Sequence, residues 1–101
     1  MLFLQISRHS IESCPMTNEK VKKVYADSYA KMDQLMKKHG IKMVGGWAAM
    51  MEHLFVGVCE APTMDALVKF SMEPEIMSLN LYCETVLQPV MTFEEAMKLL
   101  K

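Results

Sequence analysis

The order of strand-like and helix-like segments constrains this chain more than any other feature. Short stretches with alternating or nearly continuous apolar residues have the pattern of strands, and longer stretches with apolar residues three and four apart have the pattern of amphipathic helices. They follow one another as strand, helix, strand, strand, helix, strand and a short terminal helix. We expect strands at residues 2–8, 41–50, 54–60 and 82–90, and helices at 18–39, 63–72, 74–79 and 92–100.

This β-α-β-β-α-β order predicts an α+β fold of the ferredoxin-like type. Its split β-α-β units give a four-stranded antiparallel sheet with two helices on one face, and here a short C-terminal helix follows. The 101 residues suit one domain, which we place at residues 1–101. The second face of the sheet is left bare, and a large exposed apolar face marks an interface. We therefore expect a homodimer in which two copies pack these faces together about a twofold axis.

Charge and cysteine content argue against several classes of protein. The chain has 11 basic and 12 acidic residues, a net charge of −1 and no basic stripe, so we expect no nucleic-acid partner. No apolar run approaches the ~20 residues that cross a bilayer, and the first residues lack the pattern of a signal peptide, so we expect no membrane partner. Three cysteines without a C-x-x-C pair indicate reduced thiols in the cytoplasm rather than disulfides.

Twelve methionines are many for a chain of this length. Methionines that cluster with histidine bind soft metals such as copper. Here they are scattered through different segments, so we interpret them as adaptable packing groups in the core and at an interface.

The first strand has two distinct sides. One side is wholly aliphatic and consists of Leu2, Leu4 and Ile6. The other is more polar and consists of Phe3, Gln5, Ser7 and His9. We assign the aliphatic side to the helices and the more polar side to the bare face of the sheet.

The last strand offers a polar side of its own, which consists of Tyr82, Glu84, Val86 and Gln88. The first and last strands are neighbours in this fold, so we expect these side chains beside the polar side of the first strand. Polar groups that converge in an apolar setting are the default hypothesis for a ligand site. The predicted ligand-binding residues are Gln5, Ser7, His9, Trp47, Tyr82 and Glu84. Alternatively, Glu84 and Gln88 only make polar contacts across the dimer.

Two segments resemble the dimeric α+β barrel superfamily. The first is Gly46-Trp47 followed by Val56-Gly57-Val58-Cys59-Glu60-Ala61-Pro62 and a Thr-capped helix, and the second is the ending at residues 86–96, Val-Leu-Gln-Pro-Val-Met-Thr-Phe-Glu-Glu-Ala. The resemblance is greatest to small uncharacterised domains of that superfamily. It implies the ferredoxin-like fold and a homodimer. It implies no single activity, because the superfamily includes cofactor-independent monooxygenases, haem-degrading enzymes, lactone isomerases, stress-induced proteins and small metal-binding proteins.

His9 is the residue best suited to chemistry. It follows the first strand and could act as a general base, so it is the predicted catalytic residue. With Cys14 in the following loop and His53, it could instead bind a transition metal, although His-x4-Cys is not a standard zinc spacing. A structural interpretation is also open, in which His9 makes a local hydrogen bond and Cys14 packs as a small apolar side chain. Cys14 could also be a reactive thiol, because a nearby helix N-terminus favours the thiolate.

The residues favour a binding protein over an enzyme with a recognisable motif. The chain has no Ser-His-Asp or Cys-His arrangement and no Gly-rich phosphate loop, and nothing in it requires a cofactor. We expect a small homodimeric protein that binds or senses a small molecule in a pocket at the sheet face. Two alternatives stay open: a cofactor-independent monooxygenase or isomerase with His9 as base, and a metal-binding protein that uses His9, Cys14 and His53.

Overall fold

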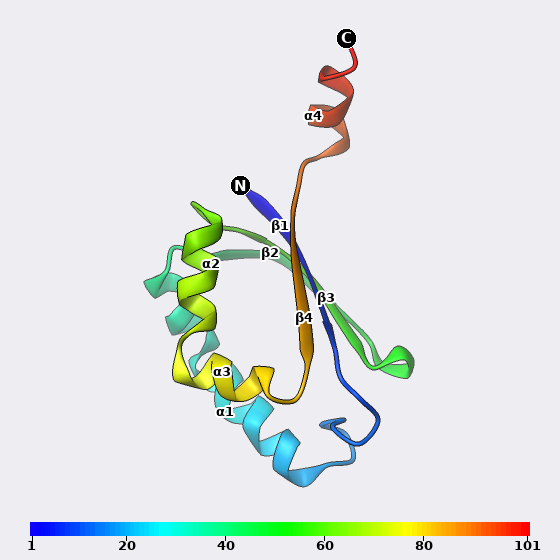
Figure 1. Ribbon diagram of the computed structural model, residues 1–101, viewed down its shortest axis with the longest axis vertical. Coiled ribbons are helices and arrows are strands. Elements are labelled where there is room, and N and C mark those ends of the chain that lie inside the picture. The colour runs from blue at the N-terminus through cyan, green and yellow to red at the C-terminus, as the bar shows by residue number, and fades with distance from the viewer.

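A computed structural model describes residues 1–101, and its elements follow the expected order (Figure 1). The strands are β1 (Leu2–Arg8), β2 (Lys42–Ala49), β3 (Leu54–Glu60) and β4 (Glu84–Val90). The helices are α1 (Glu19–Lys38), α2 (Met64–Ser71), α3 (Pro74–Asn80) and α4 (Phe93–Lys98), with a short 3₁₀ helix η1 (Met50–Glu52) at the hairpin between β2 and β3. Each expected element is present close to its expected bounds.

The four strands form one antiparallel sheet in the order β2-β3-β1-β4, so the predicted ferredoxin-like α+β fold is confirmed. Helices α1, α2 and α3 lie on one side of the sheet (Figure 1). No helix is both long and apolar enough to cross a membrane.

The helices begin where the sequence provides a cap. The side chain of Asn18 accepts a hydrogen bond from the backbone N–H of Val21 at 3.2 Å, and the hydroxyl of Thr63 accepts one from Ala66 at 3.1 Å. Thr92 likewise accepts from Glu95 at the start of α4 at 3.1 Å. These bonds satisfy N–H groups that have no partner within a helix.

The face assignment for β1 is wrong. Phe3 is fully buried under the helices and forms the core with Ile41, Cys59, Ala61 and Leu67. Since alternate residues of a strand point the same way, Gln5 and Ser7 also face the helices. The aliphatic set of Leu2, Leu4 and Ile6 therefore lies on the bare face. Sequence alternation identified the two sets correctly, but hydrophobicity alone could not decide which of them the helices cover.

The bare face of the sheet consequently carries a group of apolar side chains. Leu4 of β1 lies opposite Val58 of β3, and Ile6 lies between Val56 of β3 and Val86 of β4. Val86 is 51% exposed in the single chain. An apolar sheet face of this kind is unfavourable in water unless something covers it.

Trp47 lies on the same face, on the edge strand β2. Its position opposite Val56 places it there, and its indole folds back over Gly45. A Cβ at Gly45 would lie only 2.8 Å from Cη2 of the indole, so the glycine makes room for the ring. The tryptophan is 65% exposed.

Helix α4 lies apart from the rest of the fold. It continues beyond the end of β4 and packs on no other helix (Figure 1). Its apolar residues are exposed, with Phe93 at 90%. Helix α4 is therefore a second apolar surface without a partner, in addition to the bare sheet face.

Candidate functional site

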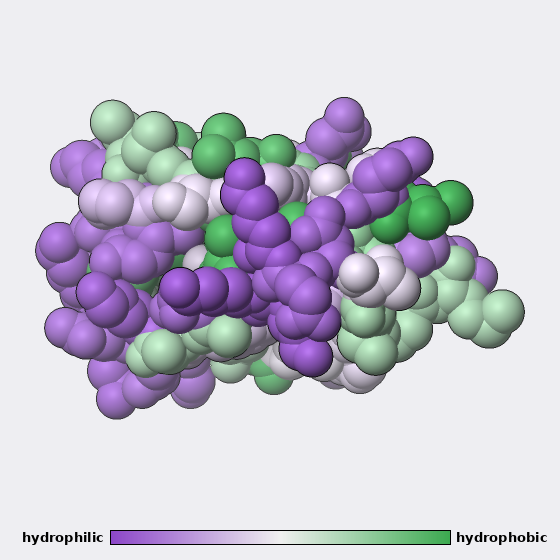
Figure 2. Space-filling view, turned by 90° about the horizontal axis from the view of Figure 1, so that it is seen from below, coloured by the Kyte–Doolittle hydropathy of each residue, from purple (hydrophilic) through white to green (hydrophobic).

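A cavity of about 450 Å³ lies between the sheet and the three helices that cover it. It is lined by 24 residues, of which 17 are hydrophobic, and they come from all four strands and from α1, α2 and α3. Three of the lining residues are methionines, Met32 and Met36 of α1 and Met43 of β2. Seen from below, hydrophilic side chains cover much of the surface and hydrophobic ones show in the space between them (Figure 2).

The lining of this cavity carries no charge. It contains no aspartate, glutamate, lysine, arginine or histidine. Burial favours the neutral form of three of its side chains: it raises the pKa of Tyr25 to about 12, and it also raises the pKa of the Cys59 and Cys83 thiols. A charged ligand group buried here would find no counter-charge, which is unfavourable.

One side of the cavity carries a line of linked polar side chains. The Gln5 amide donates to the Ser7 hydroxyl at 3.1 Å, and the Ser7 hydroxyl lies 3.0 Å from that of Thr85. Thr85 in turn donates to the side-chain oxygen of Asn80 at 3.5 Å. Cys83 joins this line through its thiol, 3.8 Å from the Thr85 hydroxyl. A ligand with one hydrogen-bonding group would find both donors and acceptors here, because a hydroxyl can turn to suit its partner.

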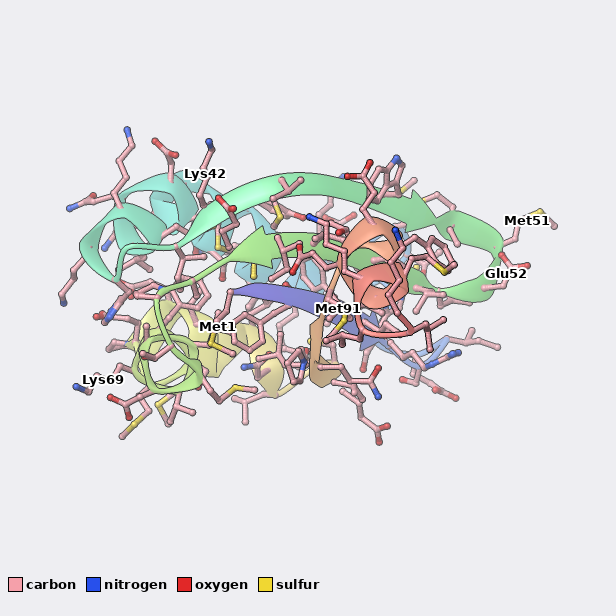
Figure 3. All side chains as sticks on the ribbon, turned by 90° about the horizontal axis from the view of Figure 1, so that it is seen from above. Met1, Lys42, Met51, Glu52, Lys69 and Met91 are labelled. Carbon is pink, nitrogen blue, oxygen red and sulfur yellow. The ribbon has the colours of Figure 1, made fainter.

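A second group of residues lies at the hairpin end of the sheet. His9 follows β1, and its backbone N–H donates to the carbonyl of His53 at 3.1 Å. This bond extends the pairing of β1 with β3, so the two histidines lie opposite each other. His53 directly follows the turn that carries Met51 and Glu52, which lie at the tip of the molecule farthest from Lys42 and Lys69 (Figure 3).

The two imidazoles and a thiol converge in this group. Nε2 of His9 lies 3.2 Å from Nδ1 of His53. The buried Cys14 comes from the loop before α1, and one ligand atom from each of the three residues lies within 4.8 Å of the other two. The structure thus brings together His9, Cys14 and His53, which the sequence singled out but could not place.

Two features of this group of residues destabilise the fold. His53 adopts a left-handed backbone, with φ 55° and ψ 49°, which costs a residue other than glycine about 1 kcal/mol. Nδ1 of His9 is buried and has no hydrogen-bond partner. Burial, and secondly the neighbouring His53, lower the pKa of His9 below its usual value. Costs of this kind concentrate at functional sites.

The predicted ligand-binding residues separate into two sets. Gln5 and Ser7 line the cavity, and Trp47 borders it at β2. Tyr82 and Glu84 do not line it, because Glu84 pairs with Arg8 on the bare-face side and Tyr82 ends the turn after α3. The expectation that Glu84 would share a face with Gln5 and Ser7 is wrong. Glu84 pairs with Arg8, and alternate residues of β1 place Arg8 on the face opposite to Gln5 and Ser7.

The sequence reasoning missed Asn80, Cys83 and Thr85 as cavity residues. Cys83 and Thr85 belong to the less polar side of the last strand, which the same face assignment had placed away from the pocket. One sequence signal could have identified them. Thr85 shares its side of the last strand with Cys83 and Leu87, so its hydroxyl lies among apolar side chains. A hydroxyl on an otherwise apolar side needs a partner when it is buried.

His9 contacts the cavity wall but does not line the cavity. Its ring lies 6.5 Å from that of Tyr25 and 5.7 Å from that of Phe55, and those two rings do line the cavity. A ligand in the cavity would therefore meet Tyr25 and Phe55 rather than the imidazole. The structure gives no support to His9 as a base for such a ligand.

Comparison with solved structures supports the fold. The chain is similar to a crystal structure described as an antibiotic biosynthesis monooxygenase, with 16% sequence identity and a TM-score of 0.57. The match covers 91% of this chain and 100% of the other. A comparison with curated proteins found no match. At this identity the similarity concerns the fold alone, and it agrees with the ferredoxin-like α+β fold described above.

Comparison with family models matches the whole chain. The matching model is described as a domain of unknown function, DUF3303, and the match covers residues 1–101. The chain therefore belongs to the DUF3303 family.

Proposed function

We propose that this protein is a small homodimer that binds an uncharged, largely apolar small molecule between its sheet and its helices. The observation that carries the proposal is the cavity of about 450 Å³, which has 17 hydrophobic lining residues and no charged one. Ligand pockets in proteins have volumes of roughly 300–1,000 Å³ and are mostly apolar, with a few placed polar groups.

The linked polar side chains along one cavity wall support a ligand that carries a hydrogen-bonding group. The side chains of Gln5, Ser7 and Thr85 are joined by hydrogen bonds along one wall. A ligand carbonyl or hydroxyl would bind there, and the rest of the molecule would pack on the methionines and aromatic rings. Methionine suits this role because its flexible thioether adapts to irregular shapes.

The bare sheet face supports the homodimer. Its side chains include Leu4, Ile6, Val56 and Val58, and Trp47 lies at its edge. Two copies that pack these faces together would bury this surface on both subunits at once, as twofold symmetry requires. The exposed Phe93 of α4 would then find a partner surface on the second subunit.

Two dyes that differ in one group test the ligand class. N-phenyl-1-naphthylamine is uncharged, and 1-anilinonaphthalene-8-sulfonate has the same ring system with an added sulfonate. We expect the uncharged dye to bind at least about tenfold more tightly, because the sulfonate would be buried without a counter-charge. Fluorescence titration measures both affinities. Equal or tighter binding of the sulfonate would contradict the proposal.

Gly57 allows the binding position to be tested. It lies on β3 and lines the cavity, and a Cβ there would make only ordinary contacts, at 3.6 Å from Met43. Gly57→Phe would place a ring in the cavity, and we expect it to weaken the uncharged dye by about tenfold or more. Gly57→Ala is the matched control and should bind within about twofold of the native protein. Unchanged binding in Gly57→Phe would place the dye elsewhere.

A further inference from the structure

We propose that His9, Cys14 and His53 form a binding site for a divalent transition-metal ion of the Zn²⁺ type, separate from the ligand cavity. The three residues come from the end of β1, the loop before α1 and the turn before β3. Their ligand atoms nevertheless lie within 4.8 Å of one another. Of these residues, none lines the cavity, so the site does not depend on the proposed ligand.

The distance between the imidazoles suits a shared metal ion. Nε2 of His9 and Nδ1 of His53 lie 3.2 Å apart. With Zn–N bonds of 2.0–2.1 Å in a tetrahedral site, two nitrogens are separated by about 3.3 Å. The same geometry places a thiolate sulfur about 3.6 Å from each nitrogen, so the sulfur and the nitrogens need to approach by no more than about 1 Å to coordinate the ion.

The facing nitrogens need something between them. Both point their binding atoms at each other, and only a proton or a metal cation can lie there favourably. A proton between them joins the two imidazoles but gives the nearby Cys14 no role. A metal ion engages all three residues at once.

The donor set selects the kind of metal. Two imidazoles and a thiolate suit Zn²⁺ and Co²⁺, whereas Mg²⁺ and Ca²⁺ prefer oxygen ligands. Three protein donors leave the fourth tetrahedral position to water, as in zinc sites that remain open. Binding releases the thiol proton of Cys14 to solvent, because a thiolate is the ligand.

Cobalt titration of the metal-free protein tests this site. Co²⁺ reports its coordination through visible absorption bands, which are strong in a tetrahedral site, and a thiolate ligand adds a charge-transfer band in the near ultraviolet. We expect both in the native protein at one ion per chain. Cys14→Ser should lose the charge-transfer band, whereas Cys83→Ser should keep it.

His53→Gly separates metal binding from a structural role. Glycine adopts the left-handed backbone at this position without strain, so this variant should unfold at the same temperature as the native protein or higher. We expect it to bind Co²⁺ at least about tenfold more weakly, because one of three ligands is missing. His39→Gln is the matched control, because it removes a histidine outside the proposed site, one that bonds to Glu73. This variant should bind Co²⁺ as the native protein does.

Zinc gives an independent measurement. A saturating excess of Zn²⁺ should raise the unfolding temperature of the native protein and of His39→Gln, but not that of His53→Gly. The proposal is overturned if the native protein shows no tetrahedral cobalt spectrum, or if His53→Gly binds cobalt and zinc as tightly as the native protein.

Discussion

The hydroxyl of Ser7 lies 3.0 Å from the hydroxyl of Thr85, and this contact joins β1 to β4 on the side of the sheet that the helices cover. It places two polar groups in a mostly apolar cavity, where each provides a hydrogen-bond partner for the other. The contact is the centre of the polar line that we assign to the ligand.

The Ser7–Thr85 contact should be measurable as a coupling free energy. Ser7→Ala and Thr85→Val each remove one hydroxyl and leave the other without this partner, which should lower the free energy of unfolding by about 1 kcal/mol. The double variant should lose less than the sum of the two, with a coupling of about 0.5–1 kcal/mol. Urea unfolding of the four proteins measures it. Strictly additive effects would mean that the hydroxyls do not interact.

Two glycines in neighbouring strands should respond oppositely to alanine. At Gly57 the added Cβ fits. Gly57→Ala should raise the free energy of unfolding by about 0.5–1 kcal/mol, because alanine lowers the conformational entropy of the unfolded chain. At Gly45 it would meet the Trp47 ring at 2.8 Å and displace it. Gly45→Ala should therefore change the emission of Trp47, the one tryptophan of the chain, without the gain in stability. An unchanged emission spectrum would show that the indole does not lie over Gly45.

The pH dependence of stability should include a contribution from Glu73. Hydrogen bonds from Lys38 at 2.7 Å and from His39 at 3.0 Å lower the pKa of its carboxyl below the usual value. A lowered carboxyl pKa stabilises the fold above the pKa of the unfolded chain, and this stabilisation is lost as the pH falls through the folded pKa. Glu73→Gln should therefore lose less stability than the native protein between neutral pH and pH about 3.

Chemical unfolding at several pH values checks this expectation. Glu52→Gln is the matched control, because Glu52 lies at the hairpin tip and forms no ion pair (Figure 3). The control should keep the native pH profile. If Glu73→Gln also keeps it, the contacts of Glu73 with Lys38 and His39 do not stabilise the fold.

The proposed dimer should depend on the bare sheet face. Val86 is 51% exposed on that face, so Val86→Asp should leave the subunit folded and halve the mass measured by light scattering, because a buried charge without a partner disfavours association. Val68 is 48% exposed on α2, away from that face, and Val68→Asp should remain a dimer.

Dilution of the native protein should shift the Trp47 emission to longer wavelength as the face becomes hydrated. A native protein that is monomeric at micromolar concentration would contradict the dimer.

The sequence was sufficient for the fold but not for the faces of the sheet. Asn18, Thr63 and Thr92 cap helices as local chemistry predicts, and the order of elements leaves few alternatives. The two sides of β1 could not be assigned in the same way. The helices cover the more polar side, whose residues Gln5 and Ser7 line the cavity, and the aliphatic side lies on the bare face.

The candidate sites show the same limit. Gln5 and Ser7 were identified on their polarity, and they do line the cavity. Thr85 and Asn80 were missed, because their role depends on the register of β4 against β1 and on where α3 ends. The convergence of His9 with Cys14 depends on a loop of irregular backbone, whose conformation no periodic pattern encodes.

The methionine methyl groups give the most direct test of the ligand cavity. Met32, Met36 and Met43 line it, whereas Met16, Met51 and Met97 lie on the exposed surface elsewhere. We expect N-phenyl-1-naphthylamine to shift the carbon-13 methyl resonances of the first three in an NMR titration and to leave those of the other three unchanged. Shifts confined to the second set, or no shift at Met32 and Met36 at saturating dye, would contradict a binding site between the sheet and the helices.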